Sequence, residues 1–134
     1  MSVDHEAVEV ALNDRLIAAA GLPDILWSGV TYSDLPAEHL FVQWVRAPGV
    51  YLTHDRTGDF RGEMLVTHKI RNPQGTTRGA AVATLIADHF NNQGRITTTA
   101  SNVVVLDQPA NPLTPIVNGE WVETPVSIRF RVIG

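Results

Sequence analysis

The chain contains no cysteine. This absence excludes disulfide bridges, zinc sites with thiolate ligands and cysteine nucleophiles, and it suits a reducing compartment. Long apolar runs are also missing, because no stretch approaches the roughly 20 residues that a membrane-spanning helix needs. The opening MSVDHEAVEV is acidic and polar rather than basic and then apolar. We therefore expect neither a secretory signal nor a membrane partner.

An excess of positive charge is lacking as well. Ten Lys and Arg residues face 14 Asp and Glu residues, which gives a formal net charge of -4. A general DNA-coating protein or a basic membrane-surface protein would need the opposite balance. What is present is ordinary globular composition, with 44% hydrophobic residues in 134. This length predicts one domain over residues 1–134.

The first expected element is an amphipathic helix over residues 4–20. Asp4 suits the N-cap position, and Glu6 lies in the first turn, where the helix dipole favours an acid. Gly21 followed by Pro23 is a stop signal. One stripe of the helix is apolar and is expected to face the core: Val8, Ala11, Leu12, Leu16, Ala19 and Ala20.

Two strands are predicted next, after an irregular stretch over residues 24–38. Residues 39–45 alternate so that Leu40, Val42 and Trp44 share one face. Residues 63–71 alternate in the same way, and residues 47–62 are expected to link the two strands as a long hairpin connection. The buried face of the second strand is expected to carry Met64, Val66, His68 and Ile70.

A second helix and further strands complete the expected fold. Asn72-Pro73 ends the strand, and Thr76 or Thr77 is the predicted N-cap of a helix that ends near residue 92. Its expected buried stripe is Ala81, Val82, Leu85, Ile86 and Phe90. Residues 102–107 and 120–132 read as strands, the latter with Val126, Ile128, Phe130 and Val132 on one face. The fold class is α+β, a mostly antiparallel sheet with two helices packed on one face.

The loop before the second helix, GTTRG at Gly75–Gly79, has the general layout of a phosphate-binding loop. A P-loop needs a lysine and a Ser or Thr directly after its last glycine. Here Ala80 and Ala81 follow Gly79, and the G-x-G start of a dinucleotide site is missing too. We therefore expect Gly79, Ala80 and Ala83 to let the helix approach the sheet closely, with a generic anion site at the helix N-terminus as the weaker alternative.

Catalytic and metal-binding patterns are not evident. The five histidines are scattered without the i, i+4 spacing of a helical metal site. His68 and His89 are expected to be hydrogen-bonded core residues. Ser28 lacks the G-x-S-x-G context of a nucleophile, and Trp121 follows an Asn-Gly hairpin signal, which favours packing over ligand stacking. We expect no catalytic residue, metal ligand or cofactor.

Three segments together point to a known family. They are RGEMLV at 61–66, a Pro-x-Gly turn before an alanine-rich helix with Ala87-Asp88 near its end, and NGEWVETPVSIRF at 118–130. In this order they resemble the tail terminator proteins of long-tailed bacteriophages, also called minor tail or tail completion proteins. The resemblance covers nearly the whole chain, is loose between Gly94 and Asn118, and concerns patterns of a structural fold.

The resemblance implies a virion protein without a cofactor. Such proteins form a ring, usually a hexamer, which caps the finished tail tube and joins it to head-completion or connector proteins. It implies assembly in the host cytoplasm, residence in the virion tail, and DNA only as cargo in the channel. A tail-tube or head–tail connector subunit is the close alternative. From another class, a small ligand- or peptide-binding α+β module stays open.

Two candidate interfaces follow from the residues. Residues 51–62, rich in glycine and charge, are expected to project as a loop that becomes ordered on docking, and the alternative is a hairpin tip without a role. The sheet face opposite the helices is expected to meet an acidic partner or line the DNA channel, and the alternative is a solvated face with Glu63 and Glu123 as counter-charges. The candidate interface residues are Tyr51, His54, Arg56, Asp59, Arg61, Lys69, Arg71, Arg129 and Arg131.

Overall fold

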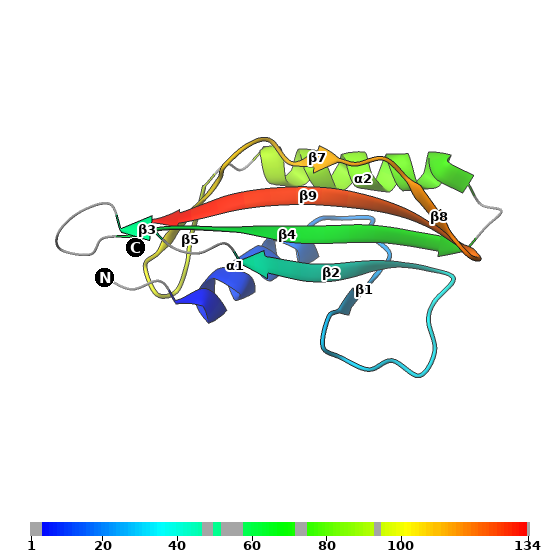
Figure 1. Ribbon diagram of the computed structural model, residues 1–134, viewed down its shortest axis with the longest axis horizontal. Coiled ribbons are helices and arrows are strands. Elements are labelled where there is room, and N and C mark those ends of the chain that lie inside the picture. The colour runs from blue at the N-terminus through cyan, green and yellow to red at the C-terminus, as the bar shows by residue number, and fades with distance from the viewer. Residues whose placement is uncertain (1–3, 47–49, 52–57, 72–74, 93–94, 134) are drawn as a thin grey trace.

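The computed structural model describes residues 4–46, 50–51, 58–71, 75–92 and 95–133. Over these residues a nine-stranded sheet packs against two helices (Figure 1). Every described strand pair is antiparallel except β1 (Asp24–Trp27) with β2 (Glu38–Arg46). The α+β class expected from the sequence is therefore confirmed. No helix within these ranges is long and apolar enough to cross a membrane.

The sheet has a central path and three short additions. The path runs β1 (Asp24–Trp27), β2 (Glu38–Arg46), β4 (Gly58–Arg71), β9 (Trp121–Ile133), β6 (Val103–Leu106) and β5 (Arg95–Thr97). The additions are β3 (Val50–Tyr51), which pairs with β4, and β7 (Asn111–Pro112) and β8 (Ile116–Asn118), which both pair with β9. The sheet thus has more strands than the sequence indicated.

The long pair β4 and β9 forms the spine of the sheet. Val66 lies opposite Val126 and Met64 opposite Ile128, and all four side chains are buried. The predicted alternation of both strands is confirmed, because side chains at every second position share one face. β4 begins at Gly58, before the predicted start at residue 63, so part of the expected connection is strand.

Helix α1 (His5–Ile17) begins at its predicted cap. The Asp4 side chain accepts a hydrogen bond from the Ala7 backbone N–H at 3.1 Å. The backbone N–H of Asp4 itself donates to the Asn102 side chain at 3.1 Å, which ties the helix to the hairpin of β5 and β6. The helix ends earlier than predicted, with Ala18 as C-cap, and Ala20 is exposed rather than buried. Val8, Leu12 and Leu16 are buried as expected.

Helix α2 (Gly75–Asn91) differs from the prediction at its start and in its buried stripe. It begins at Gly75, so Thr76 and Thr77 lie inside its first turn and neither is the N-cap. Ala81 and Leu85 are exposed, whereas Val82, Ala83, Ile86, Ala87 and Phe90 are buried. The helix is rotated relative to the predicted stripe because it packs on the sheet through its smallest residue, Gly79.

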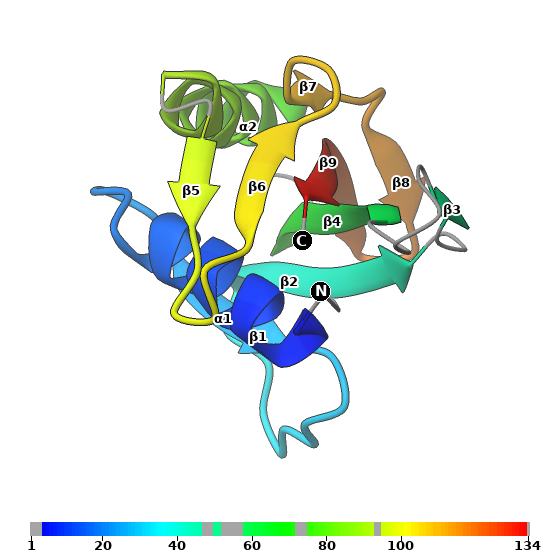
Figure 2. The same cartoon turned by 90° about the vertical axis from the view of Figure 1, so that its left-hand side faces the viewer.

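Both helices lie on the same side of β2, β4 and β9 (Figure 2), and their apolar residues form one core with the inward residues of these strands. At Gly79 the helix backbone comes so close that an added Cβ would overlap the Thr124 hydroxyl and lie 3.4 Å from His68 Nδ1. Close approach through Gly79 and buried Ala83 is therefore confirmed. For Ala80 the expectation was wrong, because this residue is exposed.

Candidate interaction surface

A polar cluster lies under the start of α2, on the helix-covered side of the sheet. Glu38 Oε2 accepts a hydrogen bond from His68 Nε2 at 3.0 Å. The same carboxylate receives Arg78 at two points, Nε at 2.8 Å and Nη2 at 3.1 Å. The hydrogen bond from Arg78 is the main reason why the pKa of Glu38 is lowered, and Glu38 in turn raises the pKa of Arg78. This cluster fastens α2 to β2 and β4.

The imidazole of this cluster and the neighbouring hydroxyl of Thr124 are buried, whereas Glu38 and Arg78 are partly exposed. His68 Nδ1 and Thr124 Oγ1 are both buried without a hydrogen-bond partner, and Glu38 orients the other nitrogen of the ring. A hydroxyl, an imidazole and a carboxylate in series are also the parts of a nucleophilic triad. His68 is fully buried, however, and the backbone of Gly79 lies against the ring and the Thr124 hydroxyl. The expectation of a core histidine is confirmed for His68.

For His89 the expected hydrogen bond is confirmed, whereas the expected core position is not, because the side chain is only half-buried. Its Nε2 donates to the backbone oxygen of Arg15 at 2.7 Å, which joins the end of α2 to α1. Within the described ranges, no three side chains of His, Cys, Asp or Glu come together as a metal site would require.

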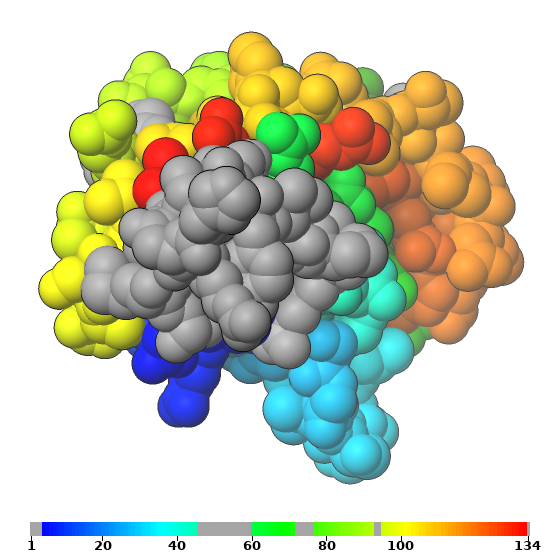
Figure 3. Space-filling view, turned by 60° about the vertical axis from the view of Figure 1, so that its left-hand side comes forward, coloured from blue at the N-terminus to red at the C-terminus, as the bar shows by residue number. Residues whose placement is uncertain are grey.

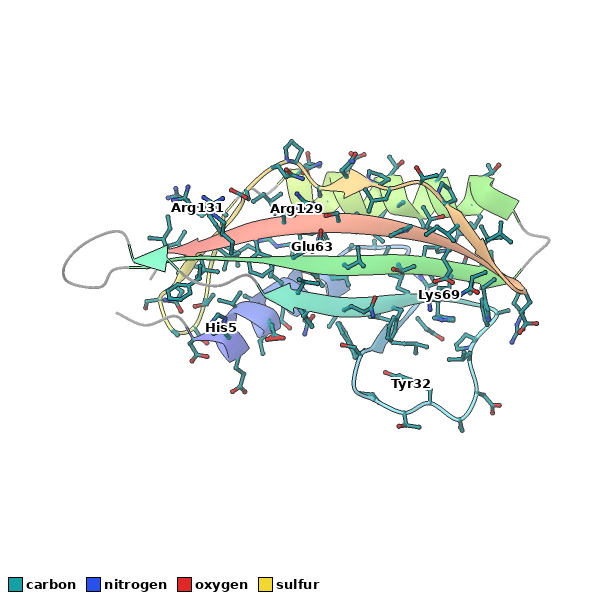
Figure 4. All side chains as sticks on the ribbon, viewed as in Figure 1. His5, Tyr32, Glu63, Lys69, Arg129 and Arg131 are labelled. Carbon is teal, nitrogen blue, oxygen red and sulfur yellow. The ribbon has the colours of Figure 1, made fainter. Side chains whose placement is uncertain are left out.

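The opposite side of the sheet, which we call the helix-free face, carries a series of ion pairs (Figure 4). Lys69 and Glu123 are cross-strand neighbours at 3.5 Å, and so are Arg129 and Glu63 at 3.4 Å. Two further pairs complete the series, Arg71 with Glu120 and Arg61 with Asp107. The predicted cations therefore share this face, with the predicted counter-charges Glu63 and Glu123 beside two of them.

One end of this face is aromatic. The Arg71 guanidinium lies 4.4 Å from the centre of the Trp121 ring, and Lys69 Nζ lies 5.0 Å from that of Phe41. The loop over residues 28–37 projects from the body of the molecule (Figure 3). Residues of this loop and of the sheet line a hollow of about 240 Å³. The lining residues include Leu26, Tyr32, Leu35, His39, Phe41 and Trp121.

His39 borders this aromatic hollow and is 2% exposed. Its Nδ1 lies 3.1 Å from the backbone oxygen of Pro36, which can only accept, so Nδ1 carries the proton. Burial lowers the pKa of His39, and the nearby charges of Lys69 and Arg71 act in the same direction. These effects favour the neutral form of the ring over the charged form.

The other end of the helix-free face is rich in arginine. Arg61 and Arg131 lie directly opposite each other on β4 and β9, and Arg129 follows two residues along the same strand face. Here a hollow of about 250 Å³, which we call the arginine hollow, is lined by Val45, Arg61, Gly62, Glu63, Asp107, Arg129 and Phe130. The side chains of Arg61 and Arg129 are 53% and 58% exposed.

The prediction that residues 51–62 form a projecting loop is partly wrong. Arg61 and Asp59 belong to strand β4, and Tyr51 belongs to β3, because these segments pair with each other beyond the end of β2. His54 and Arg56 lie outside the described residues. The sequence reasoning missed Glu120, Asp107 and Phe41, whose roles arise from strand pairings that no local pattern indicates.

Comparisons with known proteins bear on the fold. No protein-family model and no curated protein matches the chain. One solved structure, a protein without a descriptive name, is similar over 99% of this chain and 98% of its own, with 16% identity and a TM-score of 0.73. A chain in the virion of a native gene transfer agent particle is similar over 100% of both chains, with 13% identity and a TM-score of 0.67. At these identities the likeness is one of fold.

Proposed function

We propose that the protein is a structural virion protein of a phage-like particle, and that within the tail it is the terminator that caps the tube. The observation that carries the proposal is the fold likeness to a gene transfer agent virion chain, which extends over the full length of both chains. The sequence resemblance to tail terminators supports the finer role independently, since it rests on residue patterns rather than on shape.

The role proposed is non-catalytic assembly. The protein forms a closed ring, a hexamer in the family that it resembles, and binds the tube end on one side and a head-completion or connector protein on the other. DNA passes through the ring as cargo. A ring needs two different contact patches on each subunit, and the helix-free face with its two hollows offers one such surface. The protein assembles with the tail in the host cytoplasm and remains part of the virion.

Electron microscopy of the protein mixed with purified tail tubes tests the proposal. We expect ring-shaped density at tube ends only, and tubes that stop growing when the protein is added to polymerising subunits. A protein that decorates tubes along their length, or that polymerises into tubes itself, is a tube or connector subunit instead. A persistent monomer that ignores tubes would refute the assembly role and favour the ligand-binding alternative.

A further inference from the structure

The described sheet ends at β5, and the outer edge of this strand is open. Among the described strands, β5 pairs only with β6. The Thr98 N–H donates toward β6, to the Asn102 oxygen at 2.8 Å, so the backbone N–H and C=O of Thr97 point the opposite way. The other edge differs, because the outward N–H of Trp27 on β1 donates to the Tyr32 hydroxyl at 3.0 Å. The β5 edge therefore offers a donor and an acceptor that no described strand uses.

Beside this edge lies a hollow of about 420 Å³, which we call the edge groove. Helix α1 forms one wall with Val10 and Ala11, and Ile96 and Thr97 of β5 belong to the other. Val10 is 47% exposed. An exposed sheet edge can bind an extended segment as an added strand, through backbone hydrogen bonds, while pockets beside the edge receive alternate side chains. The β5 edge and the edge groove together have the form of such a site.

Strand β8 has the matching features. Within five residues, Leu113, Ile116 and Val117 are 42%, 57% and 65% exposed. A two-residue turn joins β8 to β9, so the pair that closes it, Asn118 with Trp121, is hydrogen-bonded. By alternation the backbone N–H and C=O of Val117 point away from β9. β8 thus carries an outward donor and acceptor among exposed apolar side chains.

We propose that β8 of a second copy of this chain adds to β5 as an antiparallel strand, with Val117 opposite Thr97. Side chains at successive positions alternate between faces, so Ile116 then lies on the side of Ile96 and enters the edge groove. The inference rests on the proposed ring, for which it names one contact between subunits.

The positions of the two strands require a second copy. β6, which carries β5, and β8 pair with opposite ends of β9. Figures 1 and 2 accordingly show β5 and β8 on opposite sides of the molecule, so the two strands of one copy cannot meet. Two different patches on opposite sides form the heterologous contact from which a cyclic assembly is built.

Charge favours the antiparallel direction. In this register Arg95 of one copy lies opposite Gly119 of the other, next to Glu120. Arg95 is exposed, and no described side chain pairs with it. The Glu120 side chain is 64% exposed in its ion pair with Arg71, so its carboxylate can accept a second cation. A parallel strand would instead place Arg95 beside Thr114, which carries no charge.

Disulfide formation tests the contact, and the absence of native cysteine makes it clean. Thr97→Cys and Val117→Cys are prepared as separate proteins, one carrying a removable tag, mixed with and without purified tail tubes, and oxidised with copper phenanthroline. Opposed residues of a hydrogen-bonded pair have Cα atoms about 5.5 Å apart, which a disulfide can bridge. We expect a mixed disulfide dimer.

The control for this experiment replaces Val117→Cys by Ile116→Cys. Ile116 is one residue away and 57% exposed, but its side chain points to the other face of the strand. We expect a much lower yield at position 116. A yield at 116 that equals or exceeds that at 117, or no disulfide at 117 under either condition, overturns the proposal.

A charge exchange provides the second readout, because each side of a heterologous contact can be changed in a different protein. Arg95→Glu in the Thr97→Cys protein should lower the disulfide yield about threefold, the size of effect that an exposed ion pair produces. Glu120→Arg in the Val117→Cys protein should restore the yield when the two are combined. No loss from Arg95→Glu, or no recovery in the combination, contradicts the proposed register, and thermal melts verify that the variants fold.

These measurements separate the contact from the proposed function. If the disulfide forms as expected but tubes continue to grow, the contact stands and the capping role fails. If tubes are capped while positions 97 and 117 never crosslink, the capping role stands and the contact is wrong. A photo-crosslinking residue at position 97 that captures tube protein instead of a second copy would also overturn it, with a tube segment as the added strand.

Discussion

Gly79 stands where α2 comes closest to the sheet, and its missing side chain sets that distance. An alanine there would overlap the Thr124 hydroxyl and lie 3.2 Å from Thr124 Cβ. Overpacking typically costs about 1–3 kcal/mol, whereas alanine favours a helix over glycine by about 1 kcal/mol. We expect Gly79→Ala to lower the free energy of unfolding by about 1 kcal/mol, measured by urea denaturation.

The Thr124→Ala background provides the control for this prediction. It removes the hydroxyl that the new methyl group would meet, so Gly79→Ala should cost less there or become stabilising. An equal cost in both backgrounds would show that the helix moves freely and that Gly79 does not set the packing distance.

His39 makes the free energy of unfolding of the protein depend on pH. Its pKa in the folded state lies below the usual value of 6.5, so the unfolded chain binds more protons as the pH falls through that value. The stabilising contribution of the neutral ring is therefore complete above pH 6.5 and is lost on acidification. Glu38, whose pKa is also lowered, loses its contribution only below its usual value of 4.5.

We expect His39→Gln to flatten this dependence, since glutamine keeps a donor for the Pro36 oxygen without a titrating ring. The comparison is the free energy of unfolding of both proteins by urea between about pH 7.5 and pH 5. The wild type should lose more stability than the variant over this range. Parallel curves would mean that the ring of His39 is free to accept a proton in the folded state.

At the scale of elements, one side chain fixes the end of α2. It makes the two backbone hydrogen bonds that a neighbouring strand would otherwise make. Asn91 Oδ1 accepts from the backbone N–H of Ala110 at 2.7 Å, and its Nδ2 donates to the oxygen of the same residue at 3.2 Å. Ala110 is 5% exposed, so water does not readily replace this partner. We expect Asn91→Ala to cost about 1–3 kcal/mol, because both backbone groups lose their partner.

Amide hydrogen exchange at Ala110 checks the local origin of this loss. Exchange should accelerate in Asn91→Ala more than at amides in the centre of β9. The neighbouring Asn92, also exposed, is the matched control, and Asn92→Ala should change stability little. Equal effects of the two substitutions would place the cost in helix propensity rather than in the Ala110 contact.

The strands also differ in whether they could be predicted from the sequence. β4 and β9 were predictable because a sheet buried on one side forces alternation over many residues. β1, β5, β7 and β8 were not, because each has four residues or fewer and β7 contains a proline, so their pairing comes from neighbours far along the chain. For the same reason Lys69 with Glu123 could be anticipated as a cross-strand pair, whereas Arg61 with Asp107 depends on the position of β6.

On the scale of the whole molecule, charge is distributed unevenly between the two sides. Helix α1 and its cap carry Asp4, Glu6, Glu9 and Asp14 against Arg15, while the far end of the helix-free face has Arg61, Arg129 and Arg131 together with Asp59, Glu63 and Asp107. The net charge of -4 nevertheless makes two copies repel each other on average. The sign of the salt effect on assembly therefore depends on which surfaces meet.

If the helix-free face meets an acidic partner surface during assembly, opposite charges approach and assembly should be faster at low salt, despite the net repulsion. Salt screens such attraction over about 10 Å at 0.1 M, so the rate should fall as salt is raised. We expect Arg129→Glu to slow ring formation at tube ends at low salt and to match the wild type at high salt, followed by light scattering or stopped-flow fluorescence. Lys69→Glu, at the aromatic end of the same face, is the control and should have a smaller effect. A wild-type rate that rises with salt would mean that like-charged surfaces meet, and that the arginines at this end are only a solvated part of the sheet.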